Sequence, residues 1–401
     1  MSGADRTPGP PVTPRTEPQS TPPNGPQVVP LVLEPRFERR VWGGGRLPGW
    51  VTSPAEGAVA PDQGGDDRGV AGPPGEPIGE CWLAGDDNRV VGGPYGGLAL
   101  RDVVSVLGAE LVGSVPYARY GARMPILAKL LDAAADLSVQ VHPDDAYALE
   151  HERASGHLGK SEAWYVLEAD PRAAVLWGFR RDVTESEVRD AVRGGTLPSL
   201  MHRVTVRRGD VVLNPAGTVH AILSGVLAFE IQQSSDLTYR LYDYGRLAAD
   251  GRPRALHVDK ALAVADLRGG EPNMPSPRQM PDGWVRLVQA AEFTMDRFDL
   301  GAGDAAAVTS ANAVVRDDAA VGRLGVHGKE ASQARVATGA TDAASLEILT
   351  LLGGRGTLFA ADASIPLARG TTVVLPAAQG QYRVTGSGEV IRCAVAKDEL
   401  A

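Results

Sequence analysis

Cysteine is almost absent from this sequence, since its 401 residues contain only Cys81 and Cys393. Two cysteines cannot build a disulfide framework, and these two lack the CxxC spacing of a metal or redox motif, so a reducing compartment fits best. No apolar run approaches the ~18 residues that a transmembrane helix requires. The N-terminus also lacks the basic and then apolar pattern of a signal peptide. We therefore expect a soluble, cytoplasmic protein with no membrane partner.

An excess of positive charge is also missing. The chain has 40 Lys and Arg against 49 Asp and Glu, which gives a formal net charge of −9. This balance argues against nucleic acid or an anionic membrane surface as the main partner, so any recognition of phosphate must be local. The hydrophobic fraction of 43% is nevertheless that of a globular protein with a sizeable core.

Proline, glycine and small polar residues divide the chain into parts. The first residues are rich in proline and poor in large apolar groups, so they cannot bury enough surface to order themselves. Other Pro/Gly-rich stretches predict an insertion and a linker. The predicted parts are a disordered tail at 1–27, a main domain at 28–265 with a surface insertion at 49–77, a linker at 266–283, and a C-terminal domain at 284–401 with a loop at 302–345.

Short apolar stretches separated by turn residues dominate 125–245, and they predict strands. Such strands close most naturally as a barrel or a sandwich, so we expect a mainly β fold with a few small helices. The apolar spacing of 102–114 predicts one of these helices. Thr184 and Glu187 match a capping box that opens another. Near the N-terminus, a strand through Trp42 is expected to end in a glycine turn at 43–45.

One histidine follows a series of turn-forming residues at fixed offsets. Gly209 forms a tight turn, a strand follows, and Pro215 and Gly217 then turn the backbone so that His220 points inward. This spacing resembles the second sequence motif of the cupin β-barrels, in which the histidine is a metal ligand. Without further support, His220 could equally be a satisfied core histidine.

Three upstream residues strengthen the metal interpretation. Gln140 and His142 are two apart on a predicted strand, so their side chains share one face. Glu162 lies near the start of the next strand. With His220 they offer two imidazole nitrogens, a carboxylate and an amide oxygen, a set suited to Zn²⁺ or another borderline divalent ion. Alone, Gln140 would be an ordinary strand residue and Glu162 a solvated carboxylate.

The C-terminal region contains a partial repeat of the turn motif that precedes His220. Gly370 and Pro376 repeat the spacing of Gly209 and Pro215, but Gln381 stands where the histidine would be. A second barrel that has lost its metal ligand would have this pattern. The alternative is an unrelated β-hairpin with a glycine turn.

Four longer motifs follow one another along the chain: LSVQVHPDD at 137–145, LGKSEAWY at 158–165, NPAGTVH at 214–220 and EIQQSSDLTYR at 230–240. In order and spacing they resemble the type I mannose-6-phosphate isomerases of the cupin superfamily, which makes 28–265 the expected catalytic domain. The likeness runs from about residue 31 to 265 and more faintly from 346 to 397. The interval from Glu162 to His220 leaves room for only two small helices, as in the compact bacterial branch.

The resemblance implies roles for individual residues. It makes Gln140, His142, Glu162 and His220 the ligands of one zinc ion per chain. It further implies a phosphorylated sugar as substrate, a monomeric enzyme and two cupin-like barrels, the C-terminal one without metal ligands. The residues that match its catalytic arginine, pocket lysines and pocket carboxylates are Arg240, Lys129, Lys160, Glu230 and Asp236.

The chemistry implied is an aldose–ketose isomerisation, which moves a proton between C1 and C2 through a cis-enediolate. Arg240 suits a phosphate clamp or the stabilisation of that intermediate, although it could instead pair with Asp236 for structure only. The proton carrier stays open among zinc-bound water, Lys160, Glu230, Asp236 and the surroundings of His142, with the first two ranked highest. Two alternatives are a non-catalytic, metal-containing sugar-phosphate-binding cupin and a metal-dependent oxygenase, which usually lacks such flanking Lys and Arg residues.

Overall fold

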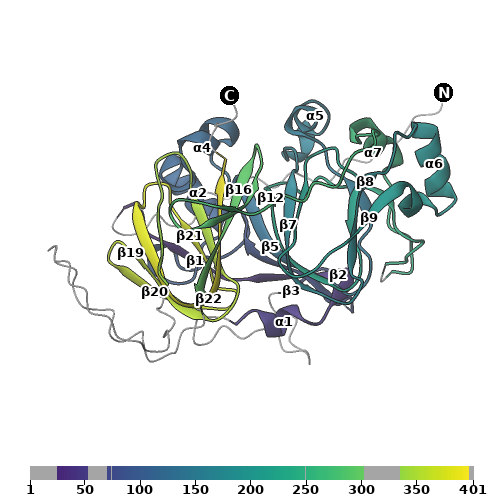
Figure 1. Ribbon diagram of the computed structural model, residues 1–401. Helices are drawn as coiled ribbons and strands as arrows, with labels where there is room; N and C mark the ends of the chain where they lie inside the picture. The colour runs from purple at the N-terminus through teal and green to yellow at the C-terminus, as the bar shows by residue number, and fades with distance from the viewer. Residues whose placement is uncertain (1–24, 53–69, 74, 249, 302–334, 397–401) are drawn as a thin grey trace, which may run out of the picture.

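The computed structural model of the chain describes residues 25–52, 70–73, 75–248, 250–301 and 335–396. Most of the predicted N-terminal tail, of the predicted insertion at 49–77 and of the predicted loop at 302–345 lies outside these residues. Three β-sheets contain most of the regular secondary structure of the described chain (Figure 1). The expectation of a mainly β protein with a few small helices is therefore confirmed.

Two of the sheets carry the candidate site. The seven-stranded sheet has the order β10 (Val211–Asn214), β7 (Glu162–Ala169), β12 (Val226–Gln233), β5 (Ile126–Ala133), β4 (Ile78–Ala84), β2 (Arg36–Gly44) and β3 (Val70–Ala71). The five-stranded sheet has the order β13 (Tyr239–Tyr242), β6 (Val139–Val141), β11 (His220–Ile222), β8 (Ala174–Phe179) and β9 (Met201–Thr205). Nearly all their pairings are antiparallel; β2 and β3 run parallel.

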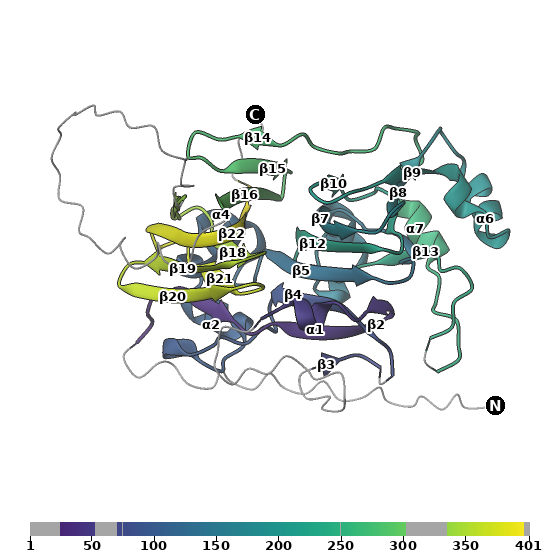
Figure 2. The same ribbon diagram turned by 60° about the horizontal axis from the view of Figure 1, so that its bottom comes forward.

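The third sheet contains ten strands, mainly from the C-terminal part, and lies on the other side of the molecule in Figures 1 and 2. Its main path is β1 (Leu31–Leu33), β21 (Thr372–Leu375), β18 (Glu347–Leu351), β22 (Gln381–Val395), β16 (Phe293–Gly301), β15 (Val285–Gln289) and β14 (Arg278–Gln279). Strands β17 (Ala337–Ala340), β19 (Arg355–Ala360) and β20 (Ala363–Ala368) extend it through the long strand β22.

The seven-stranded sheet is the central layer because its two faces are covered by different cores. Phe229 of β12 belongs to a core cluster shared with Ile348 of the ten-stranded sheet. Its neighbour Ala228 belongs to a cluster shared with Ile222 of the five-stranded sheet. Alternate residues of a strand point to opposite faces, so Glu230 faces the five-stranded sheet. The polar residues of the candidate site therefore lie between these two sheets.

Short helices connect and cover the strands. Helices α5, α6 and α7 lie beside the five-stranded sheet (Figure 1). Its outer face packs with α6 and α7 in one core cluster. The helices are α1 (Leu47–Trp50), α2 (Leu100–Leu107), α3 (Ala109–Val112), α4 (Ser114–Tyr120), α5 (Asp145–His151), α6 (Glu185–Arg193) and α7 (Val258–Val264), with 3₁₀ turns at Gly93–Tyr95, Arg153–Ser155 and Leu197–Leu200. None of the described helices is long and apolar enough to cross a membrane.

The helical structure predicted over 102–114 is confirmed, but it is not one continuous helix, because the structure breaks this segment into α2, α3 and the start of α4. The breaks fall at Gly108 and Gly113, whose φ angles of 53° and 98° are left-handed. At Gly113 an added Cβ would lie 2.4 Å from the carbonyl oxygen of Ala344. The third helix therefore depends on a close approach to the C-terminal part, which local periodicity cannot reveal.

The predicted glycine turn at 43–45 is also displaced. Strand β2 continues to Gly44, and Gly43 pairs with Ala133 of β5. A Cβ at Gly43 would come 2.5 Å from the backbone nitrogen of Gly79, so glycine permits close packing of strands here rather than a turn. The predicted capping box is confirmed, since Thr184 and Glu187 of α6 bond to each other's backbone.

The N-terminal strand β1 is paired with β21, more than 300 residues later in the sequence. A continuous core cluster also spans residues of the seven-stranded and ten-stranded sheets. The two parts of the chain are thus closely packed together. The division into two barrel domains with the boundaries given above stays a prediction.

Candidate metal centre and active site

Two histidines are brought together by the turn that precedes His220. The turn is closed by a hydrogen bond from the Thr218 amide to the Pro215 carbonyl at 3.0 Å, with Gly217 at a left-handed φ of 87°. The Gly217 amide in turn donates to the carbonyl oxygen of His142 at 2.8 Å. This places the end of β6 against the start of β11.

Backbone carbonyls fix the tautomer of both rings. His142 Nδ1 lies 2.8 Å from the Leu237 carbonyl oxygen, and His220 Nδ1 lies 2.8 Å from that of Thr218. A carbonyl oxygen only accepts, so Nδ1 of each ring carries a proton, and in the neutral ring Nε2 then has the lone pair. Neutral imidazole with a free Nε2 is the form that binds metals.

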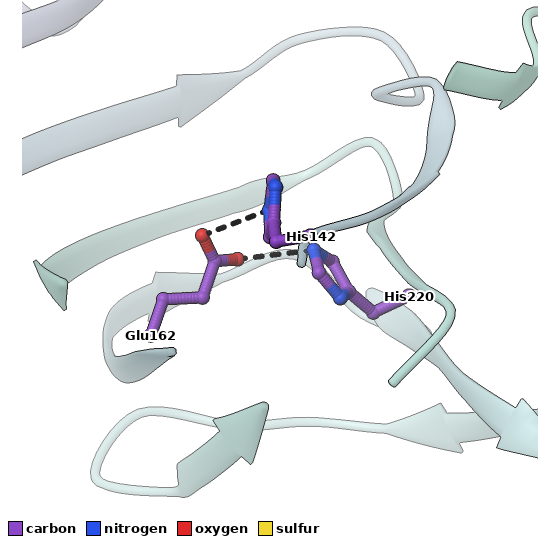
Figure 3. Close-up of side chains that lie close together, drawn as sticks. All are labelled: His142, Glu162 and His220. Atoms are coloured by element: carbon purple, nitrogen blue, oxygen red, sulfur yellow. Dashed lines mark ion pairs between the residues drawn. The ribbon is translucent and has the colours of Figure 1, made fainter. Parts of the chain in front are cut away.

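Glu162 at the start of β7 faces both free nitrogens (Figure 3). Its Oε2 lies 3.3 Å from His142 Nε2 and its Oε1 lies 3.1 Å from His220 Nε2. The three residues are about 1% exposed, and their candidate ligand atoms all lie within 4.8 Å of one another. The two Nε2 atoms and both Glu162 oxygens have no hydrogen-bond partner in the described structure.

The charge states of these groups suit a cation. Burial, reinforced by the charge of Lys160, lowers the pKa of His142 to about 3, so its ring is neutral at ordinary pH. Burial alone would raise the pKa of Glu162, but the charge of Lys160 holds that pKa well below its usual range. Two imidazoles and one carboxylate are a donor set for a divalent ion with open coordination positions.

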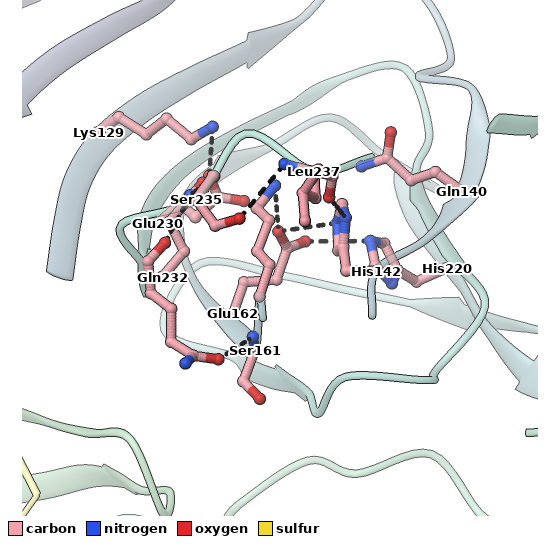
Figure 4. Close-up of polar contacts among 12 residues, drawn as sticks. Lys129, Gln140, His142, Ser161, Glu162, His220, Glu230, Gln232, Ser235 and Leu237 are labelled. Atoms are coloured by element: carbon pink, nitrogen blue, oxygen red, sulfur yellow. Dashed lines mark hydrogen bonds and ion pairs between the residues drawn. The ribbon is translucent and has the colours of Figure 1, made fainter. Parts of the chain in front are cut away.

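Gln140 stands beside this cluster in the sheet. It is opposite His220 on β11 and opposite Arg240 on β13, so the three side chains share one face. Its Oε1 lies 3.4 Å from the Ser138 hydroxyl. In Figure 4 the Gln140 side chain is drawn near the two rings. Its role as a fourth ligand stays a prediction that this position favours.

A pocket of about 300 Å³ adjoins the cluster between the two sheets. Lys160 connects this pocket to the cluster of His142, Glu162 and His220. Its side chain lines the pocket, and its Nζ lies 3.0 Å from Glu162 Oε2. All five residues assigned to catalysis from the sequence, together with Gln140, line this pocket. The five are Lys129, Lys160, Glu230, Asp236 and Arg240.

Two of these residues form a buried ion pair. Lys129 Nζ lies 2.8 Å from Glu230 Oε2, and the indole of Trp164 donates to Glu230 Oε1 at 2.8 Å. Burial and the charge of Glu162 raise the pKa of Glu230. Against the effect of burial, Glu230 and Glu80 raise the pKa of Lys129, so the lysine stays charged.

Arg240 and Asp236 do not pair with each other. Asp236 is exposed, and no ion pair links it to Arg240 in the part of the chain that the structure describes. The Arg240 guanidinium instead donates to the Ala255 carbonyl oxygen at 3.0 Å. Burial and the charge of Arg254 lower its pKa. The purely structural Arg240–Asp236 pair considered from the sequence is therefore wrong.

The sequence reasoning missed a second charged group in the pocket wall. Arg40 on β2 holds Glu80 on β4 with two hydrogen bonds of 3.0 Å, and the Trp82 indole donates to the same carboxylate at 2.8 Å. Lys129 Nζ is 3.9 Å from Glu80. The alternation of Glu80 and Trp82 along a strand was the available signal, but their partner on β2 depends on pairing between strands.

Glu80 should make stability depend on pH. Burial opposes its ionisation, yet Lys129 and Arg40 lower its pKa to about 2 from an ordinary value of 4.5. The stabilisation is therefore fully present above pH 4.5 and is lost as the pH falls towards 2. We expect Glu80→Gln to lower the free energy of unfolding by roughly 3 kcal/mol at pH 7 and by roughly 1 kcal/mol at pH 3.

Urea unfolding at both pH values would test this expectation. The matched control is Glu150→Gln, which neutralises a carboxylate with a 77% exposed side chain and should have little effect at either pH. A loss in Glu80→Gln that is the same at pH 7 and pH 3 would contradict the low pKa.

Comparisons with known proteins agree with this site. Family models match at residues 55–163 ("Phosphomannose isomerase type I, catalytic domain") and at 330–395 ("Mannose-6-phosphate isomerase, cupin domain"). Mannose-6-phosphate isomerase ManA of Bacillus subtilis is 30% identical over 90% of this chain and 98% of its own length. Mannose-6-phosphate isomerase of Streptococcus mutans is 37% identical over 66% of this chain and 74% of its own length.

A solved structure extends the likeness to the whole fold. The crystal structure of mannose 6-phosphate isomerase from Bacillus subtilis matches with a TM-score of 0.70 and 29% identity, over 92% of this chain and 99% of that chain. Between Glu162 and His220 the present chain has only α6 and one 3₁₀ turn as helices, as the resemblance to the compact branch led us to expect. The chain belongs to the type I mannose-6-phosphate isomerase family.

Proposed function

We propose that the protein is a zinc-dependent isomerase that interconverts mannose 6-phosphate and fructose 6-phosphate. The observation that carries this proposal is the cluster of buried ligand atoms on His142, Glu162 and His220 that have no hydrogen-bond partner in the described structure, beside a pocket lined by lysines and arginines. With Gln140 as a fourth donor, this set suits zinc. Membership of the family supports this substrate and this reaction.

The residues of the pocket have different proposed roles, according to their positions. A bound zinc ion would polarise the sugar oxygens or hold the open-chain hydroxyls. Lys160 and Lys129 place positive charge near the negative charge that develops on the enediolate. Arg240 presents a guanidinium without a carboxylate partner, which suits the substrate's phosphate. Of the chain's own groups, buried Lys160 and Glu230 are placed to move the proton, whereas Asp236 is exposed.

Metal removal tests the function directly. In a coupled enzymatic assay that detects the formation of fructose 6-phosphate, we expect turnover of mannose 6-phosphate. A chelator should abolish this turnover, and added Zn²⁺ should restore it. A far-UV circular dichroism spectrum of the chelated protein should show that the fold is kept. Binding of one metal ion without any turnover would contradict the proposal and favour the non-catalytic sugar-phosphate-binding cupin.

The proposal also carries expectations from the sequence about the protein's setting. We propose that it acts as a monomer in the cytoplasm, in line with its two buried, unpaired cysteines. Light scattering of the purified protein measures the first of these, and fractionation of cells measures the second.

A further inference from the structure

The cations that line the pocket are not equally neutralised. Four of them face a carboxylate, whereas Arg240 has none among the described residues. Its Nε is buried without a hydrogen-bond partner. The unbalanced positive charge is thus at the wall formed by β13 and the segment that follows it. The four pairs are Lys129 with Glu230, Lys160 with Glu162, Arg40 with Glu80, and Arg254 with Asp243.

Arg254 completes this wall. Its Nε and Nη2 hold the two oxygens of Asp243 at 2.8 and 2.5 Å, and Asp243 is 5% exposed. This two-point contact fixes the plane of the guanidinium. Nη1 of Arg254 has no acceptor in the described structure, although the residue lines the pocket. One edge of the group is therefore anchored and the other edge is free to bind a ligand.

The backbone holds the two arginines together. The Arg240 guanidinium donates to the carbonyl oxygen of Ala255, the residue after Arg254, at 3.0 Å. The amide of His257 donates to the Arg240 carbonyl oxygen at 2.7 Å. The charge of Arg254 is close enough to lower the pKa of Arg240, after the effect of burial. Like charges this close are costly unless an anion lies between them.

We propose that Arg254 and Arg240 together bind the phosphate group of the substrate, and that Arg254 sets the preference for phosphorylated over neutral sugars. The inference rests on the proposed function and names the residue that anchors its substrate. Two planar guanidinium groups with free N–H donors match the several oxygens of a phosphate dianion. The phosphate end of the sugar then lies at this wall, and its reacting end lies towards Lys160 and the metal ligands.

The test uses Arg254→Gln in the full-length, zinc-loaded protein. We expect the KM for mannose 6-phosphate and the inhibition constant of inorganic phosphate each to rise about tenfold or more, with kcat changed less than about threefold. Removal of Arg254 leaves Asp243 unpaired, so the double variant Arg254→Gln, Asp243→Asn is measured as well. The matched control is Arg252→Gln, which removes an exposed positive charge from the same segment without touching the pocket.

The outcomes separate this inference from the function on which it rests. Calorimetric titration of wild type and variants with mannose 6-phosphate measures the phosphate site even where no turnover occurs, so an inactive wild type would overturn only the function. Unchanged phosphate inhibition and mannose 6-phosphate affinity in both Arg254 variants would overturn the inference. An equal weakening by Arg252→Gln would overturn it too, because the effect would then be one of general charge.

Discussion

His220→Ala is expected to lose both the bound metal and at least about three orders of magnitude in turnover. The ring contributes one of the two free Nε2 atoms beside Glu162, and its Nδ1 is fixed by the Thr218 carbonyl, so no neighbouring group can replace it. A metal that polarises the sugar oxygens supplies several kcal/mol of stabilisation in the transition state, which corresponds to roughly a thousandfold in rate. Metal analysis of the purified variant and the coupled assay measure the two losses separately.

The control for this variant lies in the same row of the same sheet. His202 on β9 pairs with Trp177 on β8, which in turn pairs with His220. However, His202 is not part of the candidate metal-binding cluster. His202→Ala should keep the metal and nearly all of the turnover. A His220→Ala protein that is folded and free of metal but keeps its activity would refute a metal-dependent reaction.

The residues of the candidate metal centre could be brought together from the sequence because local sequence fixes much of their geometry. Pro215 and Gly217 determine the turn before His220. Gln140 on β6 and His142 at the end of this strand are two residues apart, so their side chains share one face. The family resemblance then assigned these residues, together with Glu162, to one metal site. Each inference needed only a strand, a turn and an offset of a few residues.

Arg40, Glu80 and Arg254 could not be assigned in this way. Arg40 meets Glu80 only because β2 pairs with β4 across forty residues, and Arg254 reaches the pocket through an irregular segment anchored on Asp243 and Arg240. Periodicity shows which face of a strand is polar, but it does not show which strand is its neighbour.

The same limit explains the errors in the fold. Local apolar spacing favoured one helix at 102–114, whereas contact with Ala344 and Leu346 requires a left-handed break at Gly113. The pairing of β1 with β21 joins the ends of the chain and has no local signal at all. Short-range chemistry thus predicted the site better than the packing around it.

Lys129→Met is expected to lower the free energy of unfolding by about 3–5 kcal/mol, because it leaves Glu230 as an unpaired buried charge. Glu230 is 2% exposed, and its remaining protein donor is the Trp164 indole. Burial already raises its pKa, and loss of the lysine should raise it further. A raised carboxyl pKa costs stability as the pH rises above the unfolded value of about 4.5, so the loss should be smallest below that pH.

A second substitution shows whether the unpaired charge is the cause. Glu230→Gln added to Lys129→Met removes that charge while its amide oxygen can still accept from Trp164, so most of the lost stability should return. Glu80 does not compromise this recovery, since Arg40 and Trp82 still bind it. Lys260→Met, at a lysine whose side chain is 55% exposed, is the matched control and should cost less than about 1 kcal/mol. If the double variant were as unstable as Lys129→Met, the lost stability would come from the packing of the lysine side chain and not from the unpaired charge. The Lys129–Glu230 ion pair would then not be needed for folding, and its role would lie in the reaction.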